Sequence, residues 1–595
     1  MAEYLLAFKP ATGLYGQHDP SAVLFEDGEL VFGVEEERFS REKHAPSTFP
    51  GQAIEACLEY RDLELSDVDR VVLPYDPPLQ SRIVAYDLRD ALGADGVFGK
   101  LNHLEQTVRR QLTAQLFPET RVRSELAKIG TPLPPIERRS HHACHAASAF
   151  HPSGFERAVV VTADAKGEYD STVVWRGTPD GLERVRTYEH PNSLGLFYAI
   201  VTEYLGYRMF NGEGKVMGLA AYGDRDPDIE AALRDVIETG IDYDVTRLTR
   251  RWGTEHGITV LEELFDRPGR DEPGEFTEWE KNFAHTAQVL LEETVLSIIE
   301  RYAEQFGFED VALAGGVALN CTLNASIRAS PAVDRVFIQP VAHDAGLAVG
   351  AGYLDQPPDA VDPMESVYWG PEYTTDSIVS ELEKNKIGHE RPDDLTNYVA
   401  GRIAEGALVG WFQGRLEMGP RALGNRSILA DPRTEESRDR INAFVKHREG
   451  WRPFAPSMLE EAAAEYLCDY VSDPYMITTF SVREERADEI AAVLHPANGT
   501  TRPQTVRRDQ NPRYYRLLTA FAEETGVPVL LNTSFNDNGE PIVRTPTEAI
   551  KDFFGMGLDL LVLDDVIVEK KHQTRSLREM DPLDEPQPDW RVRES

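Results

Sequence analysis

Two histidines spaced four residues apart form the strongest chemical pattern in this sequence. In SHHACHAASAFHPSGF, His141 and His145 lie among small residues that suit a helix, and Pro152 and Gly154 would end that helix. Side chains four apart project from one helix face, and two imidazole nitrogens on one face are the usual beginning of a metal site. The same spacing also fits surface or core histidines, so both interpretations are kept at this point.

A metal site needs further ligands, and two aspartates stand at suitable places. Asp164 ends the apolar run VVVTAD, and Asp344 in QPVAHDAGLAVGAG follows a predicted strand and precedes a helix of small residues. Carboxylate oxygens complete imidazole sites for divalent metals. The alternative for Asp344 is a simple helix N-cap.

Basic side chains are concentrated in one later segment, WFQGRLEMGPRALGNRSILADPR followed by VKHREGWRPFAPS. Residues 408–454 contain nine basic and six acidic side chains, although the whole chain is strongly acidic. Arginine forks match phosphate oxygens in bidentate geometry, so the segment predicts an anion site. Arg502 in GTTRPQTV, with Asn532 and Ser534 in VLLNTSFN, would add donors. A salt-bridge network is an equal alternative on composition. The basic residues of the segment are Arg415, Arg421, Arg426, Arg433, Arg438, Arg440, Lys446, Arg448 and Arg452.

Two glycine-bearing loops could bring backbone close to a ligand. They are NGEGKVMGLAAYG, residues 211–223, and LAGGVALN, residues 313–320. Small residues before a helix can offer backbone amides to a phosphate. Neither loop matches an established nucleotide fingerprint, so each is a weak signal by itself.

The elements that must position these residues follow a repeated pattern. A strand at residues 4–8 is followed by a predicted hairpin of residues 22–26 and 29–34, joined by Asp27-Gly28. Residues 157–176 repeat the layout of strand, polar glycine loop and strand. This indicates a duplicated α/β domain with both loops at one cleft, or else two unrelated hairpins.

Apolar spacing predicts helices over residues 194–207 and 276–306, and a buried strand that enters a double glycine over residues 310–320. Thr545, Pro546 and Glu548 form a capping box that predicts another helix start.

Composition limits the classes of function. The 595 residues include 62 Lys and Arg against 101 Asp and Glu, for a net charge of −39, which argues against a general nucleic-acid or anionic-membrane binder. Lysine is a minority among the basic residues, and such an acidic surface suggests a halophilic source. The four cysteines have no paired spacing, and no signal peptide or spanning apolar run is present, so we expect reduced thiols and a soluble, cytoplasmic protein.

The chain is expected to form two domains. Residues 1–356 would be the first, the proline-rich stretch 357–373 a linker, 374–572 the second domain, and 573–595 a mobile tail. Residues 84–130 and 225–275 look like charged insertions.

Several long motifs in order resemble one family. HDPSAVLFEDG, EEERFSREKHAPSTFP, HHACHAASAF, GRLEMGPRALGNRSILADPR, WRPFAPS, GTTRPQTV and LLNTSFN with GEPIV are similar to those of the NodU/CmcH-type, or nebramycin-synthase-like, O-carbamoyltransferases. The resemblance covers about residue 4 to about residue 570. It implies an α/β fold with an N-terminal duplicated domain of the actin-like, sugar-kinase and heat-shock ATPase type, which is Kae-like, and a C-terminal YrdC-like domain.

The resemblance also implies ligands and roles. His141, His145 and Asp344, with Asp164 nearby, would hold a divalent metal, expected to be Fe(II), and Mg²⁺ would accompany ATP. The C-terminal basic cluster would convert carbamoyl phosphate and ATP into carbamoyl adenylate, and the N-terminal domain would pass the carbamoyl group to a hydroxylated small molecule. The residues assigned to carbamoyl phosphate are Arg421, Arg426, Lys446, Arg452, Arg502 and Asn532. Those assigned to the nucleotide are Asn192, Gly212, Glu213, Gly214, Lys215, Gly315, Gly316 and Asn320.

A hydroxyl that attacks a carbonyl needs a proton acceptor. The N-terminal loops offer His18, Asp19, Lys43 and His44, of which Asp19, Lys43 and His44 are the catalytic candidates; solvated loop charges are the alternative. The rival functions are an actin-like sugar kinase or ATPase, a threonylcarbamoyl-type tRNA-modifying transferase, and a silent metabolite-binding or assembly protein. The net charge disfavours nucleic acid as a partner, and no membrane partner is expected. The acceptor and the assembly state, with a homodimer as one option, stay open.

Overall fold

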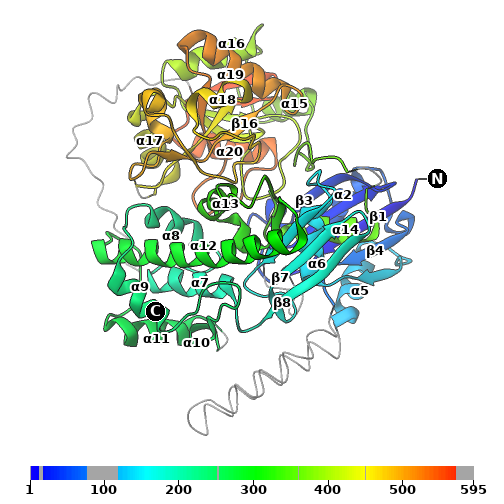
Figure 1. The fold of residues 1–595 in the computed structure, drawn as a ribbon. Helices are drawn as coiled ribbons and strands as arrows, with labels where there is room; N and C mark the ends of the chain where they lie inside the picture. The colour runs from blue at the N-terminus through cyan, green and yellow to red at the C-terminus, as the bar shows by residue number, and fades with distance from the viewer. Residues whose placement is uncertain are drawn as a thin grey trace, which may run out of the picture.

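The computed structural model describes residues 2–11, 18–76, 118–250, 253–358, 361–448 and 451–570 (Figure 1). The predicted tail, and the part of the predicted insertion 84–130 that precedes residue 118, lie outside the described residues. Two five-stranded sheets and a layer of helices form the N-terminal part, and the C-terminal domain, coloured yellow-green to red, lies above them in Figure 1.

The first sheet is built from an antiparallel hairpin and three parallel strands. Its strands are β1 (Tyr4–Lys9), β2 (Ser21–Glu26), β3 (Glu29–Glu35), β4 (Arg70–Leu73) and β5 (Ile136–Arg138), in the order β3-β2-β1-β4-β5. Asp27 and Gly28 both have positive φ at the β2–β3 turn, which confirms the predicted hairpin. The short elements that follow are α1 (Glu37–Ser40), α2 (Gly51–Glu59), η2 (Leu65–Asp67) and α5 (Pro118–Ile129).

The second sheet repeats the first. Its strands are β6 (Ala158–Ala163), β7 (Asp170–Thr178), β8 (Gly181–Glu189), β9 (Asp310–Ala314) and β10 (Arg335–Ile338), in the order β10-β9-β6-β7-β8. In both sheets the first strand pairs antiparallel with the second and parallel with the fourth. The predicted duplication is therefore confirmed, and the arrangement is the duplicated α/β domain of the actin-like type.

Two helices join the sheets at their centre. Helix α6 (His141–Phe150) follows β5 but packs against β6 and β9 of the second sheet, whereas α14 (Leu347–Asp355) follows β10 but packs against β1 and β2 of the first. The two helices also pack on each other, with Gly350 at the contact. A Cβ at Gly350 would lie 1.7 Å from the Cys144 carbonyl oxygen, so the close approach requires glycine there.

A helical layer covers the second sheet. It contains α7 (Leu194–Tyr204), α8 (Glu213–Ala220), α9 (Pro227–Arg234), α10 (Thr246–Thr249), α11 (Glu255–Phe265), α12 (Glu278–Phe306) and α13 (Cys321–Arg328), with η4 (Gly316–Leu319) and η5 (Asp344–Gly346) in the loops. Helix α12 begins at a Thr277–Glu280 capping box and ends at Gly307 in the left-handed region. The predicted helices at residues 194–207 and 276–306 are thus confirmed.

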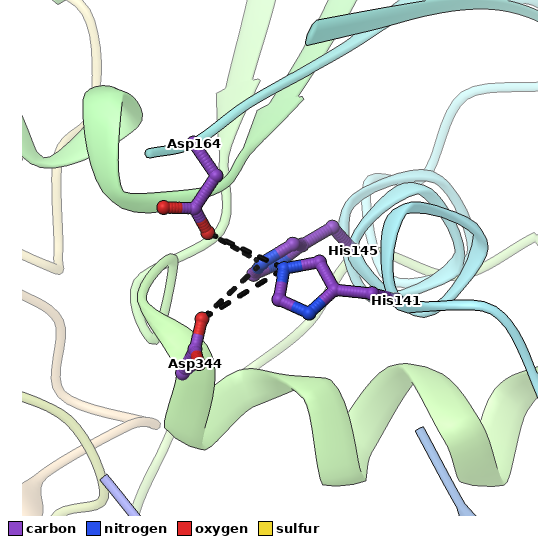
Figure 2. Close-up of side chains that lie close together, drawn as sticks. All are labelled: His141, His145, Asp164 and Asp344. Carbon is purple, nitrogen blue, oxygen red and sulfur yellow. Dashed lines mark hydrogen bonds and ion pairs between the residues drawn. The ribbon is translucent and has the colours of Figure 1, made fainter. Parts of the chain in front are cut away.

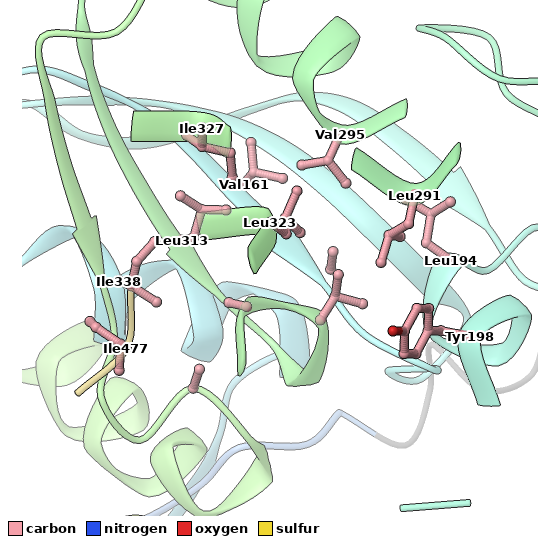
Figure 3. Close-up of a cluster of buried hydrophobic side chains, with 14 of the residues drawn as sticks. Val161, Leu194, Tyr198, Leu291, Val295, Leu313, Leu323, Ile327, Ile338 and Ile477 are labelled. Atoms are coloured by element: carbon pink, nitrogen blue, oxygen red, sulfur yellow. The ribbon is translucent and has the colours of Figure 1, made fainter. Parts of the chain in front are cut away.

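The core beneath this layer draws on both domains. Figure 3 shows Val161 and Leu313 of the sheet, Leu291 of α12 and Ile477 of the C-terminal domain as members of one buried cluster. Burial of shared apolar surface stabilises the domain contact as well as each domain.

The C-terminal domain is a seven-stranded mixed sheet with helices. The strands are β11 (Val409–Phe412), β12 (Arg426–Ala430), β13 (Ala455–Leu459), β16 (Gln504–Val506), β17 (Val529–Ser534), β18 (Leu560–Leu563) and β19 (Val566–Glu569), in the order β16-β13-β17-β12-β11-β18-β19. Strands β14 (Phe480–Ser481) and β15 (Thr500–Thr501) form a separate pair. The helices are α15 (Thr375–Lys384), α16 (Leu395–Ala404), α17 (Glu435–Ile441), η6 (Asn442–Lys446), α18 (Glu460–Tyr466), η7 (Glu484–Val493), α19 (Pro512–Thr525) and α20 (Pro546–Gly555).

Helix α20 begins with the predicted capping box, because Thr545 and Glu548 bond each other's backbone amides. The segment predicted as a linker contacts both domains: the Met364 amide donates to the Pro152 carbonyl of the N-terminal domain, and the Val367 carbonyl accepts from the Met418 amide of the C-terminal domain. Among the described helices, none is long and apolar enough to cross a bilayer.

Candidate functional site

Four side chains from distant parts of the N-terminal domain converge on one point (Figure 2). The Nε2 atoms of His145 and His141 lie 3.1 and 3.4 Å from Oδ2 of Asp164, and 3.9 and 3.8 Å from Oδ1 of Asp344. One ligand atom from each of the four residues lies within 4.8 Å of all the others. We call these residues the four-residue cluster.

The fold explains why they meet. His141 and His145 project from one face of α6, Asp164 follows β6, and Asp344 begins η5 after β10. Because β6 and β10 belong to the same sheet, both aspartates reach the same edge, above which α6 presents its histidines. Two imidazole nitrogens and two carboxylate oxygens form a donor set that suits a divalent first-row transition metal.

The pKa values reflect close ion pairing in a buried place. Burial acts to raise the pKa of Asp164, but hydrogen bonds from His141 and His145 hold it well below its usual value. Burial lowers the pKa of His145, whereas contact with Asp164 and Asp344 outweighs burial and raises the pKa of His141. The pKa values of both Asp164 and Asp344 are lowered, so the two carboxylates are held in the ionised form that can ligate a cation.

Lys9 is a neighbour of the cluster that sequence reasoning missed. Its Nζ lies 2.9 Å from Oδ2 of Asp344 and also donates to the carbonyl of His18. This ammonium helps to keep the pKa of Asp344 below its ordinary value, although burial acts in the opposite direction. A lysine at the end of a strand carries no distinctive sequence signal.

One cavity of about 370 Å³ connects the cluster to the C-terminal domain. From the N-terminal domain it is lined by Asp164, Asp344 and the loop residues described below. From the C-terminal domain it is lined by Pro420, Arg421, Ser534, Asn536, Glu540, Pro541 and Ile542. Asn536 and residues 540–542 belong to the quoted motifs LLNTSFN and GEPIV but received no predicted role, because their place in the lining depends on how the domains pack.

The predicted catalytic residues lie in this cavity. The Asp19 carboxylate bonds Nδ1 of His18 at 2.7 Å and Nδ1 of His44 at 2.8 Å, so one carboxylate orients two imidazoles. Lys43 donates to Asn211 at 3.3 Å, and burial lowers its pKa. The ring of Phe210, 41% exposed and at positive φ, lies 4.8 Å from the His18 ring.

One ligand atom from each of Asp19, Glu37 and His44 also lies within 4.8 Å of the other two, so these residues could be considered as metal ligands. Their atoms already bond within the protein: Glu37 accepts the His44 amide at 2.6 Å and pairs with Arg38 at 2.9 Å. This group is better described as a His44 imidazole that Asp19 and Glu37 hold in place by hydrogen bonds.

Some of the residues predicted to bind nucleotide in the two glycine-bearing loops line the cavity, and others do not. Gly316, Asn320, Glu213 and Gly214 line the cavity, and a Cβ at Gly316 would come within 3.2 Å of Oδ1 of Asp164. Gly212, Lys215 and Gly315 lie outside its lining. Gly315 has a structural reason, because its φ is 93° and a Cβ there would lie 2.2 Å from the Ala163 carbonyl oxygen.

Asn192 has a structural position instead of a place in the lining. Its side chain donates to the Tyr243 carbonyl and accepts from the Val245 amide. The predicted contact of Asn192 with nucleotide therefore finds no geometric support.

Two of the predicted anion-binding arginines stand together. Arg421 Nη2 and Arg502 Nη1 each lie 3.7 Å from the Cys321 sulfur. Burial, together with the like charge of Arg502, lowers the pKa of Arg421 to about 10. Paired guanidinium groups with unfavourable mutual repulsion are stabilised by a bound anion.

Arg426 is a correction to the prediction. Its side chain is fully buried, its guanidinium donates to the carbonyls of Gln413 and Gly414, and it lies 3.6 Å over the Phe412 ring. The sequence placed it among the phosphate ligands because an arginine inside a basic run looks the same whether it faces a ligand or the core.

The remaining predicted ligands, Lys446, Asn532 and Arg452, lie outside the cavity lining. Lys446 donates to the carbonyls of Ser534 and Asn536, and burial lowers its pKa to about 7. Asn532 belongs to a buried group with Ser457 and Gln504. Arg452 is close enough to Lys43 to lower its pKa.

The fold defines a two-domain α/β protein with a duplicated N-terminal domain of the actin-like type. Comparison with known families then places it: the carbamoyltransferase N-terminus model matches residues 11–353, and the carbamoyltransferase C-terminus model matches residues 400–570. The chain belongs to the carbamoyltransferase family and is an enzyme of that family.

Curated relatives agree. The chain is 40% identical over 571 residues to nodulation protein NolNO of Sinorhizobium fredii, covering 93% of this chain and 79% of that protein. It is 34% identical to the 3'-hydroxymethylcephem-O-carbamoyltransferase of Amycolatopsis lactamdurans, covering 60% of this chain and 65% of the relative. Among solved structures, component A of the Acidaminococcus fermentans (R)-2-hydroxyglutaryl-CoA dehydratase aligns with a TM-score of 0.32 at 13% identity, over 59% of this chain and 97% of that one.

Proposed function

We propose that the protein is an ATP-dependent O-carbamoyltransferase that acts through carbamoyl adenylate on a hydroxyl of a small-molecule acceptor. The observation that carries the proposal is one cavity whose lining includes Asp164 and Asp344 of the four-residue cluster, the hydrogen-bonded residues His18, Asp19 and His44, and Arg421. The relative from Amycolatopsis lactamdurans carries O-carbamoyl transfer in its name.

The first half-reaction would use the C-terminal residues. Carbamoyl phosphate loses phosphate to water, the resulting carbamate oxygen attacks the α-phosphorus of ATP, and pyrophosphate leaves. Arg421, Arg502, Lys446 and Arg452 would bind the anionic groups, because spread phosphoryl charge is stabilised by several fixed donors. The lowered pKa of Arg421 supports this role, since an anion would relieve its repulsion with Arg502.

The second half-reaction would use the N-terminal residues. The acceptor hydroxyl attacks the carbamoyl carbon, its proton passes to an imidazole held by Asp19, and AMP leaves. His44 and His18 are both candidates, because each directs Nδ1 to Asp19 and so keeps Nε2 for the proton. Gly316 lets backbone approach the adenylate phosphate beside Asp164.

A divalent metal fits the four-residue cluster, and we propose Fe(II), with Mg²⁺ accompanying ATP. His141, His145, Asp164 and Asp344 would hold the metal, which would supply positive charge for the leaving phosphate.

Incubation with ATP and carbamoyl phosphate tests the proposal. We expect pyrophosphate, followed by AMP when a hydroxylated acceptor is present. His145→Ala should abolish metal binding and transfer while sparing pyrophosphate release, and Arg452→Ala should stop pyrophosphate release while sparing the metal. ADP as the product would indicate a kinase, and loss of the same half-reaction in both variants would contradict the division of labour.

A further inference from the structure

Two walls of the cavity come from opposite domains and meet at a seam. One wall contains Glu37, Arg38, Lys43 and His44, and the other contains residues 540–542. Arg41 lies between the two pairs of wall residues in the sequence but is not itself part of the lining.

The Arg41 side chain, which is not part of the cavity lining, bonds to residues of the other wall across this seam. Its Nη1 donates to the Ile542 carbonyl at 2.7 Å and its Nη2 to the Pro541 carbonyl at 2.7 Å. The same guanidinium pairs with Glu540 at 3.3 Å and Glu548 at 3.4 Å. The side chain is 22% exposed, so these contacts are largely shielded from water.

The backbone of Arg41 also shapes the first wall. It caps α1 with a φ of 57° and donates its amide to the Glu37 carbonyl. This left-handed turn returns the chain toward Lys43 and His44. Arg41 therefore combines the turn behind one wall with side-chain hydrogen bonds to two backbone carbonyls of the other wall.

Loss of this guanidinium would remove the bridge to the Pro541 and Ile542 carbonyls, whereas Arg544 would still donate to the Arg38 carbonyl across the same seam. The Pro541 and Ile542 carbonyls would lose charge-assisted donors, Glu548 would lose its ion pair with Arg41, and Glu540 would keep its ion pair with Lys551 but lose the one with Arg41. Water would then reach the cavity between the walls.

We propose that Arg41 is a positioning residue that closes the cavity around carbamoyl adenylate and keeps water from it. This inference rests on the proposed function. In the unwanted reaction, water attacks the carbamoyl carbon, the bond to the adenylate oxygen breaks, and AMP and carbamic acid form; carbamic acid then decomposes to carbon dioxide and ammonia.

The test needs no acceptor. Full-length protein is mixed with ATP and carbamoyl phosphate, and pyrophosphate and AMP are followed in time. The wild type should release about one equivalent of pyrophosphate and then turn over slowly, because the adenylate is retained. Arg41→Ala should give continued release of AMP and pyrophosphate in equal amounts, at least tenfold faster in the steady state.

A conservative variant and a matched control complete the design. Arg41→Lys keeps the charge, but an ammonium cannot donate to both carbonyls as a guanidinium fork does. Its steady-state rate of AMP release should therefore lie between those of wild type and Arg41→Ala. Arg391→Ala removes an arginine that is also paired with a carboxylate, Asp565 at 2.6 Å, far along the sequence and 64% exposed; it should behave as wild type. Hydrogen exchange at residues 540–544 should rise in Arg41→Lys even if Arg41→Ala is too unstable to assay.

The outcomes separate the two ideas. If wild type shows the pyrophosphate burst, and Arg41→Ala and Arg41→Lys then release AMP in the slow phase at the wild-type rate, the role of Arg41 is overturned and the proposed function stands. The absence of any pyrophosphate from wild type would overturn the proposed function, and the inference with it.

Discussion

Gly350→Ala tests whether the contact between α6 and α14 positions the four-residue cluster. The new Cβ would lie 1.7 Å from the Cys144 carbonyl oxygen, where ordinary contacts are 3.4–4 Å. A backbone carbonyl inside a helix cannot turn away, so the helices must separate by roughly 1.7 Å or more at that point. Overpacking of this kind costs about 1–3 kcal/mol, and we expect a value near the upper end.

The displacement should reach the ligands. Two ligand atoms bound to one ion at about 2.1 Å each cannot be more than about 4.2 Å apart. The histidine nitrogens now lie 3.8 and 3.9 Å from Asp344, so little room remains. Because α6 carries the histidines and Asp344 lies just before α14, we expect the dissociation constant for Co²⁺, a stable substitute for Fe(II), to rise at least tenfold.

Thermal or denaturant unfolding and Co²⁺ titration calorimetry measure the two effects. Gly401→Ala is the matched control, because Gly401 also lies in a helix, α16, but a Cβ there meets nothing within 4 Å. It should stabilise the protein by about 0.5–1 kcal/mol and leave metal affinity unchanged. Unchanged stability in Gly350→Ala would refute the packing argument, and a loss of stability with normal Co²⁺ affinity would refute the positioning argument.

Other predictions concern charge. Burial lowers the pKa of Lys446 to about 7, so kcat/KM for carbamoyl phosphate should fall as pH rises through 7, and Lys446→Arg should flatten that profile. Burial raises the pKa of Asp473 to about 6. Between pH 4 and 6 the folded state therefore binds a proton that the unfolded state has lost, so the free energy of unfolding should decrease by roughly 2–3 kcal/mol as pH rises through this range. The denaturant midpoint of Asp473→Asn should not show this dependence on pH. Arg502→Ala should raise the pKa of Arg421, which loses a like-charged neighbour, yet reduce pyrophosphate release by about 10²-fold or more. An unaltered release rate, or pH profiles identical to wild type, would contradict these assignments.

Local rules were sufficient for several elements. The spacing of His141 and His145, the Asp27-Gly28 hairpin and the capping box of Thr545 and Glu548 all depend on residues at most four apart. Backbone geometry acts over that range, so the local sequence is enough to determine these features. The repeated strand, loop and strand pattern likewise predicted the duplicated domain.

Only the tertiary structure decided which side chains meet and which are removed from water. Asp164 and Asp344 are distant in the chain, and their approach depends on β6 and β10 lying in one sheet. Arg421 and Arg426 belong to the same basic run, yet one lines the cavity and the other donates to carbonyls in the core. Lys9 acquires its position from packing within the N-terminal domain, and Arg41 and residues 540–542 acquire theirs from packing between the domains. Burial and long-range contacts set these outcomes, because the free energy of a charged group depends on its neighbours in space and on its access to water.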